Sequence, residues 1–188
     1  MHSECRLSCR RVCCIVAAML VCASGSPGTA QAQDAVPIKR NWFDDPFFNV
    51  SHGLSACPAP EGPMLTEAER RDQMHSRLER GTSCWLAGRC KDSNAYRYDK
   101  GLQAPVRSAL LRVPGMQRAS VWVIVQRRWV YLQGCVPDAK MARRLEGAAR
   151  SVADVETVVP DLMIGTRGKP PYAVAPTTTT ETSTPGKQ

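Results

Sequence analysis

The chain has 188 residues, a formal net charge of +8 and only three histidines. The positive excess favours anionic partners such as lipid headgroups, although it is equally consistent with a charge that simply keeps the protein soluble. No apolar run reaches the roughly 20 residues that a bilayer span needs, which excludes a transmembrane helix.

The first 32 residues have the features of an export signal. The basic lead MHSECRLSCRR precedes the apolar run VCCIVAAMLVCA, and the tripeptide AQA ending at Ala32 is a pattern after which signal peptidase cuts. We therefore predict a signal peptide over residues 1–32 and a periplasmic mature protein with a net charge of about +6. Lipoprotein processing at Cys22 is the alternative, although Val21 is bulky where a small residue is preferred. Export argues against nucleic acid as the partner.

Four of the nine cysteines remain once this signal is removed. They are Cys57, Cys84, Cys90 and Cys135. An even number in an oxidising compartment predicts two disulfides, for which three pairings are open. A zinc site is the alternative, formed by Cys84 and Cys90 with His52 and His75. The five residues between these two sulfurs match no usual zinc motif, so disulfides are preferred.

Residues 33–98 are predicted to form an N-terminal arm that contains one helix. As far as residue 62 the arm is rich in proline and aromatic residues but has neither a helical nor a strand period, which predicts irregular structure. A capping box of Thr66 and Glu69 begins a run of helix formers, and Gly81 suits the position after its last turn. We therefore predict a helix over residues 67–80.

Two further helices and a strand are expected around a hairpin. Apolar residues from Leu102 onward fall on one stripe, and the regular helix is placed after Ala104 so that Pro105 lies in its first turn. Asp138 begins a second amphipathic helix. A last strand follows over residues 157–164, and its proline indicates an edge position in the sheet. The Pro/Thr-rich tail over residues 166–188 is predicted to be disordered.

The stretch VWVIVQRRWVYLQG alternates apolar side chains strictly and predicts a β-hairpin. With Arg127-Arg128 as a two-residue turn, Val125 lies opposite Val130. Such turns prefer Asn-Gly because both central residues need positive φ, so a longer loop or a bulge remains open. The hairpin is apolar on both faces, and one face collects aromatic residues together with Cys135.

This order of elements resembles a known family. The run VWVIVQRRWVYLQGCV, the alanine-rich KMARRLEGAAR and the stretch SVADVETVVPDLMIG are similar to the BON domain, a small αββαβ module of bacterial envelope proteins. Leu132, Gly134 and Val136 match its Leu-x-Gly-x-Val motif, and Val155 and Val158 match the opening of its last strand. The resemblance covers residues 102–165. It implies an α+β fold with two helices on one face of a three-stranded sheet.

The resemblance also implies a function at the envelope. Such domains do non-enzymatic work there, in association with phospholipid or with envelope assemblies and often under osmotic or membrane stress. We therefore expect a protein that binds the phospholipid surface and supports envelope integrity or osmotic-stress tolerance. The alternative is a protein-interaction subunit that docks onto an envelope or secretion assembly.

The residues themselves show no sign of catalysis. Neither His52 nor His75 lies in a nucleophile elbow or a metal motif, and the chain has no other histidine outside the predicted signal. Only Asp44 and Asp45 form a pair of carboxylates on one predicted segment. We therefore expect no enzymatic activity, no cofactor and no metal.

The aromatic face of the hairpin allows two predictions. Either the arm and the helix after Thr66 cover this face, or the face contacts a bilayer with the arginines at its rim. Because Cys135 falls on this face, any disulfide that it forms ties the arm over it, which favours the covered arrangement. Cys84 and Cys90 are close enough to pair with each other, which leaves Cys57 to pair with Cys135.

A lipid site is expected along a basic edge that joins the hairpin tip to the second amphipathic helix. The residues expected to contact anionic lipid are Arg127, Arg128, Lys140, Arg143, Arg144 and Arg150. A cation near an anionic membrane surface contributes about 1 kcal/mol. The alternative is that the helical members form the ordinary solvated face of an amphipathic helix.

Overall fold

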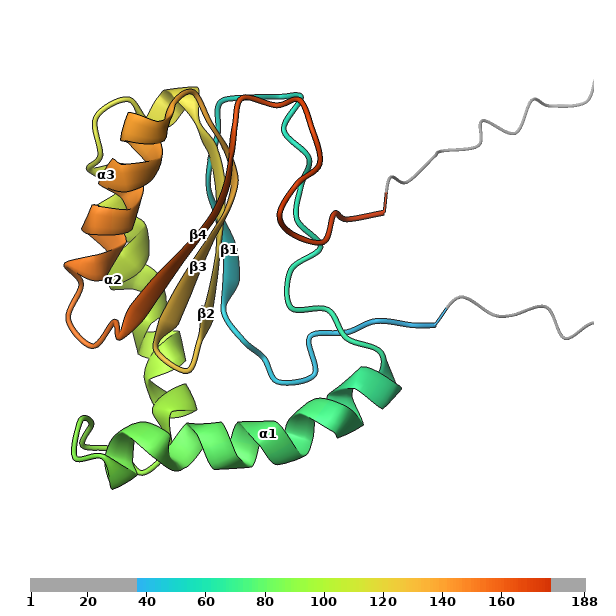
Figure 1. Ribbon diagram of the computed structural model, residues 1–188, viewed down its shortest axis with the longest axis vertical. Coiled ribbons are helices and arrows are strands. Elements are labelled where there is room, and N and C mark those ends of the chain that lie inside the picture. The colour runs from blue at the N-terminus through green and yellow to red at the C-terminus, as the bar shows by residue number, and fades with distance from the viewer. Residues whose placement is uncertain (1–36, 177–188) are drawn as a thin grey trace, which may run out of the picture. The chain divides into compact units, whose positions relative to one another are not determined.

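The computed structural model describes residues 37–176, and Figure 1 shows how their elements are arranged. The predicted signal peptide and residues 177–188 lie outside the described part. The described residues form a mixed α+β fold. Two 3-10 helices, η1 (Ala95–Tyr98) and η2 (Met116–Arg118), lie on either side of the second α-helix in the chain.

A single sheet of four strands, in the order β1-β2-β3-β4, organises this part of the chain. β2 (Ser120–Gln126) pairs antiparallel with both β1 (Phe47–His52) and β3 (Trp129–Val136). β4 (Thr157–Ile164) runs parallel to β3 at the edge of the sheet, where its proline removes no hydrogen bond that a neighbouring strand needs.

The prediction of three strands was wrong because the N-terminal arm contributes β1. Phe48 and Val50 are buried in the core, whereas the residues between and around them are not, so the strand does alternate. This period of two is short, and a register shift between Asn49 and Ser51 interrupts it. A pattern of so few residues gives little signal in the sequence, and the pairing partner β2 defines the strand.

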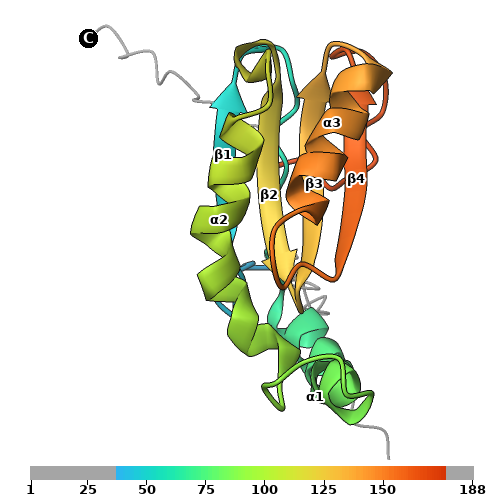
Figure 2. The ribbon, with the colours of Figure 1, turned by 90° about the vertical axis from the view of Figure 1, so that its left-hand side faces the viewer.

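Two helices cover one face of the sheet, which we call the first face (Figure 2). They are α2 (Asp99–Leu111) and α3 (Ala139–Arg150). Asp138 caps α3 as predicted, because its side chain accepts a hydrogen bond of 2.8 Å from the Met141 N–H. The core lies between these helices and the sheet, and its fully buried members include Val106, Leu110, Val121, Val123, Val125, Val130, Leu132 and Leu145.

Helix α2 begins earlier than the sequence predicted, so that Pro105 lies inside it. A proline within a helix removes one backbone hydrogen bond and disfavours the preceding turn. The first turn forms nevertheless because Asp99 is buried and its carboxylate binds the hairpin turn. A tertiary contact therefore overrides the local preference that placed the helix start near Ala104.

Helix α1 (Glu67–Leu86) has the predicted start but runs beyond the predicted end at residue 80. The capping box of Thr66 and Glu69 is present at its start. Gly81, expected to follow the last turn, is a buried residue within the helix. A Cβ atom there would lie 2.9 Å from the Asn94 side chain, so glycine allows close packing instead of ending the helix.

The hairpin has the predicted register, with Val125 opposite Val130, and a tight two-residue turn. Arg127 and Arg128 both have positive φ, at 57° and 64°, as a turn of this kind requires. The open alternative of a longer loop is thus wrong. Gly134 in β3 has a φ of 124°, and a Cβ atom on it would lie 2.1 Å from the Ser120 carbonyl oxygen, so this position accepts only glycine.

The second face of the sheet, the aromatic face of the prediction, is covered only in part. Residues 53–60 of the arm and residues 166–176 lie over its end away from the hairpin turn, whereas the arm then continues toward α1, which lies beyond the turn (Figure 1). The Cys57–Cys135 disulfide joins this covering segment to β3. The predicted covering by α1 is therefore wrong.

Residues 166–176 belong to the tail that was predicted to be disordered, but they are ordered in the structure. Tyr172 is buried, and its hydroxyl donates a 2.8 Å hydrogen bond to the Pro58 carbonyl oxygen. Val174 forms a β-bridge with Pro60. A buried aromatic side chain and a short β-bridge together hold a segment that composition alone assigns to disorder.

Candidate interaction surfaces

The hairpin turn is held by a buried carboxylate. The Asp99 side chain accepts hydrogen bonds from the backbone N–H groups of Arg127 and Arg128, both at 2.7 Å. A left-handed conformation costs roughly 1–2 kcal/mol for a residue with a side chain. Hydrogen bonds to a charged acceptor are among the stronger ones and offset this cost. Asp99 therefore explains how two arginines occupy a turn that favours Asn-Gly.

Burial changes the acidity of this carboxyl group. Removal from water raises the pKa of Asp99 from 3.8 to about 6, because desolvation penalises the charged form. The two backbone hydrogen bonds act in the opposite direction without cancelling it. The turn consequently rests on a group that takes up a proton in mildly acidic solution.

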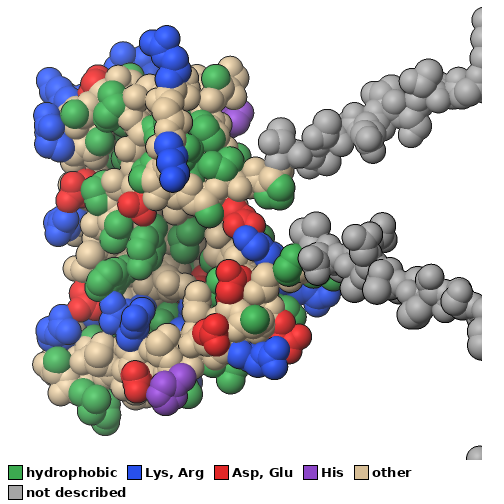
Figure 3. All heavy atoms as spheres, turned by 45° about the vertical axis from the view of Figure 1, so that its right-hand side comes forward, with side chains coloured by type: hydrophobic (Ala, Val, Ile, Leu, Met, Phe, Trp, Pro, Cys, Tyr) green, Lys and Arg blue, Asp and Glu red, His purple; other side chains and the backbone are tan. Residues whose placement is uncertain are grey.

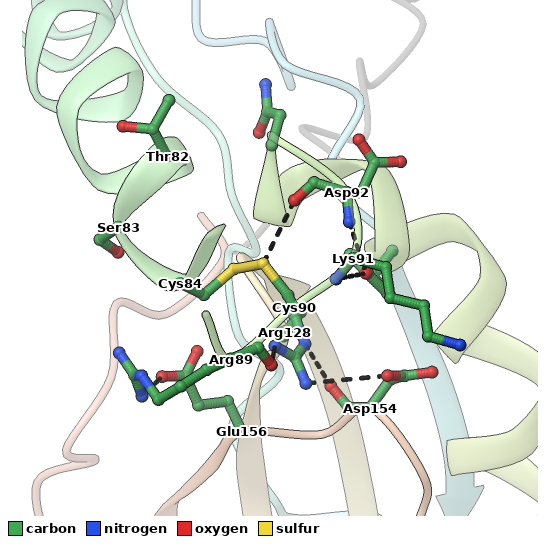
Figure 4. Close-up of a disulfide and its surroundings, with 12 residues drawn as sticks. Thr82, Ser83, Cys84, Arg89, Cys90, Lys91, Asp92, Arg128, Asp154 and Glu156 are labelled. Carbon is green, nitrogen blue, oxygen red and sulfur yellow. Dashed lines mark hydrogen bonds and ion pairs between the residues drawn. A yellow bond between two sulfur atoms is a disulfide. The ribbon is translucent and has the colours of Figure 1, made fainter. Parts of the chain in front are cut away.

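Arg128 does not belong to the predicted lipid site. Its side chain is buried, its Nε donates a 2.7 Å hydrogen bond to the Asp154 carbonyl oxygen, and its guanidinium lies 5.0 Å from the ring centre of Tyr98. Figure 4 shows it directed toward Asp154, beside Arg89 and the Cys84–Cys90 disulfide. A guanidinium engaged in this way is not available to a phosphate, so Arg128 joins the β2–β3 turn to the loop before β4.

Arg127 lies on the second face of the sheet, away from α3. Its guanidinium sits 4.5 Å from the ring centre of Trp129, whose side chain points to the second face. Helix α3 covers the first face (Figure 2). The predicted basic edge is therefore divided between opposite faces, and the hairpin tip and α3 do not form one site.

The remaining predicted residues lie on α3, where two of them face α2. Lys140 and Arg144 are exposed and one turn apart. Arg144 lines a hollow of about 370 Å³ between α2 and α3, opposite Arg112. Arg112 was not predicted, and the sequence places it just after the end of a helix without showing that it faces α3.

Arg143 and Arg150 point to the other side of α3. Arg150 forms an ion pair of 2.6 Å with Glu146, the only carboxylate on this helix. Among residues 37–176, no ion pair involves Lys140, Arg143 or Arg144. Three unneutralised cations therefore remain on α3.

The two disulfides have the pairing that the sequence favoured. Cys57 is joined to Cys135, and Cys84 to Cys90. The zinc alternative fails because both sulfurs of the close pair are already bonded. Next to that pair, Arg89 forms an ion pair with Glu156 and accepts a hydrogen bond from Arg128 at its carbonyl oxygen (Figure 4). The loop after α1 is thereby tied to the strand ends.

Asp44 and Asp45 do not form a pair of catalytic carboxylates. Asp45 is buried and binds both terminal nitrogens of Arg77, at 2.6 and 2.9 Å, whereas Asp44 pairs with Lys100 on α2. The Arg77 guanidinium is stacked 4.0 Å from the ring centre of Phe43. This buried ion pair joins the arm to α1, and sequence reasoning missed it because the two charges are far apart in the chain.

The uncovered half of the second face contains a hollow, which we call the sheet groove. It measures about 300 Å³ and is lined by Pro63, Ile124, Gln126, Tyr131, Gln133 and Asp161. Hydrophobic side chains gather in the middle of this face (Figure 3). The strand register places the outward side chains in three rows across the sheet, which are Asp161, Gln133 and Trp122; Val159, Tyr131 and Ile124; and Thr157, Trp129 and Gln126.

Polar atoms in and beside the sheet groove lack partners within the described residues. The Gln133 Oε1 and the Trp129 Nε1 are buried without a hydrogen bond. The Asp161 carboxylate forms no side-chain hydrogen bond or ion pair with residues 37–176, and burial raises its pKa.

Comparison with known proteins agrees with this architecture. Residues 98–166 match the family model of the BON domain. The chain contains a BON domain. The match begins at the last residue of η1 and ends just after β4, so it includes α2, β2, β3, α3 and β4. Searches of the curated proteins and of the solved structures found no match.

The BON domain is the module that the sequence resemblance indicated, and proteins with this domain are connected with the envelope and with osmotic stress. BON proteins are generally not enzymes. Strand β1, helix α1, the covering segment of the arm and residues 167–176 lie outside the matched residues. No helix within residues 37–176 has the length and apolar character to cross a membrane.

Proposed function

We propose that this protein is an exported BON-domain protein that binds the anionic phospholipid surface of the envelope and supports envelope integrity under osmotic stress. The observation that carries the proposal is the set of unneutralised cations on the first-face helices. Lys140 and Arg144 lie on the side of α3 that faces α2, and Arg112 lies across the hollow from Arg144.

The charge distribution around this hollow supports the proposal. Its walls are otherwise uncharged, being formed by small and apolar residues with one serine, so no carboxylate competes with a phosphate. Each cation near an anionic membrane surface contributes about 1 kcal/mol, and this contribution is screened by salt. Compared with the site predicted from the sequence, the proposed site no longer contains Arg127 and Arg128. It gains Arg112 and keeps Lys140 and Arg144 on α3.

The test is flotation of the protein, expressed from the 188-residue sequence and purified with both disulfides formed, with vesicles that contain anionic phospholipid. We expect binding at low salt that weakens at physiological salt. The Lys140→Ala/Arg144→Ala variant removes two cations, so its affinity should fall by roughly 30-fold at low salt.

A matched control removes the same charge elsewhere. Arg71 and Arg80 are exposed on α1, so Arg71→Ala/Arg80→Ala changes the net charge equally and should retain binding within about threefold. Equal losses in the two variants would show that binding follows net charge and not this site. Failure to bind anionic vesicles at either salt concentration would refute the proposal.

A further inference from the structure

The sheet groove has no part in lipid binding as proposed above, since it lies on the second face and the cations of α3 lie on the first. Its rows differ in chemistry. The row with Asp161 presents a partly buried carboxylate, whose oxygens have no donor among the described residues. This end of the groove accepts hydrogen bonds and favours a positive charge.

The surface next to the opposite end of the groove favours a negative charge. There the Arg127 guanidinium lies 4.5 Å from the ring centre of Trp129, in the third row. Arg127 forms no ion pair with the residues that the structure describes. The middle row separates the two ends with an apolar surface formed by Val159, Tyr131 and Ile124.

The distance between the two ends restricts the length of a ligand that can contact both. Asp161 and Thr157 are four residues apart on β4, and a strand rises about 3.3 Å per residue, so the outer rows are roughly 13 Å apart. An extended peptide repeats its side-chain direction every second residue and therefore matches three rows with residues i, i+2 and i+4. The amino group and phosphate of a phosphatidylethanolamine headgroup are separated by only two carbon atoms and do not span this distance.

We propose that the sheet groove binds an extended peptide segment of a partner protein in the pattern basic-x-apolar-x-acidic. The basic side chain pairs with Asp161, the apolar side chain packs on Tyr131, and the acidic side chain faces Arg127. Charge complementarity at both ends and the strand period together determine this occupant. The proposal is independent of lipid binding.

The probe is the capped peptide acetyl-Lys-Ser-Val-Ser-Glu-amide, titrated into the isotope-labelled full chain with both disulfides formed, to roughly 10 mM by NMR. A dissociation constant near 1 mM is typical of so small a contact. We expect chemical-shift changes at the amides of Ile124, Tyr131, Gln133 and Asp161. The Asp161→Asn variant should bind about tenfold more weakly, because it loses the charge-assisted pair.

Two controls make the result specific. Asp72 is an exposed carboxylate on α1, so Asp72→Asn changes the net charge equally and should bind within twofold of the unaltered protein. Replacing lysine by glutamine in the peptide should reproduce the loss seen with Asp161→Asn. Absence of shifts up to 10 mM, unchanged affinity in Asp161→Asn, or shifts confined to other surfaces would overturn the proposal. If only phosphatidylethanolamine vesicles bind and Asp161→Asn abolishes that binding, the occupant is a lipid headgroup and the peptide assignment is wrong.

Discussion

The two faces of the sheet are built differently although both are rich in apolar residues. The first face is sealed by α2 and α3, and Val123, Val125 and Leu132 are inaccessible to solvent there. The second face is covered only near the Cys57–Cys135 disulfide, and its other half remains open as the sheet groove. One face therefore supplies most of the hydrophobic stabilisation, and the other presents a surface.

The comparison also explains why the hairpin is apolar on both sides. The alternating valines fill the first-face core, and the aromatic residues on the other side divide between a small covered cluster and the sheet groove. A strand that is apolar on both faces usually lies between two layers. Here the second layer is incomplete, which leaves the aromatic side chains of Trp129 and Tyr131 partly exposed.

Removing the disulfide that holds the second-face cover should have the largest effect. In the chain-entropy model, the Cys57–Cys135 link, with a sequence separation of 78, contributes about 4.5 kcal/mol to the free energy of unfolding. The Cys84–Cys90 link, with a separation of 6, contributes about 2 kcal/mol in the same model. Urea denaturation of the two Cys→Ser double variants measures both.

Hydrogen exchange on the same variants tests whether the two faces of the sheet lose their protection separately. Loss of the Cys57–Cys135 bond should increase exchange at residues 54–62 and 172–175, and α2 should stay protected. Equal loss of protection on both faces would show that the cover and the core unfold as one unit.

Truncation of one side chain on each face tests where the stability lies. Leu132 is fully buried against the helices, so Leu132→Ala should lower the free energy of unfolding by about 3.5 kcal/mol. Ile124 is only partly buried in the sheet groove, so Ile124→Ala should cost about 1 kcal/mol. Chemical denaturation measures the free energy of unfolding of both variants. Similar losses of stability at the two positions would contradict the difference between the faces.

The hairpin turn, where both faces end, should respond to pH through Asp99. Its pKa is raised from 3.8 to about 6 in the folded protein, so the folded state binds the proton more tightly than the unfolded state does. The stabilisation from protonation is complete below pH 4 and is lost as the pH rises through 6, with a magnitude of at most about 3 kcal/mol.

The Asp99→Asn variant isolates this contribution. The free energy of unfolding of the unaltered protein minus that of the variant should decrease from pH 4 to pH 7, because other titrating groups cancel in the difference. Urea denaturation at each pH measures it. A difference that stays constant or increases with pH would show that burial does not control Asp99.

The site was less predictable than the fold. Asp138 as a helix cap, the register of Val125 and Val130, and the residues of β4 follow from local patterns and were confirmed. The six predicted lipid residues share a charge but not a surface, because Arg127 and α3 lie on opposite faces and Arg128 is buried. Charge along a sequence does not reveal direction in space.

Local sequence patterns were sufficient to predict the strand periods of the hairpin and β4, the helix caps at Thr66 and Asp138, and the even number of cysteines outside the predicted signal. The strand periods and the helix caps depend on neighbouring residues, and the cysteines can be counted in the sequence. None of these features requires a structure. The burial of Arg128, the addition of β1 by the arm and the open part of the second face became apparent only from the fold. The reason is that Asp99, Asp154 and β2 are distant in the chain, and the free energy of burying a charge or pairing a short strand comes from such distant partners.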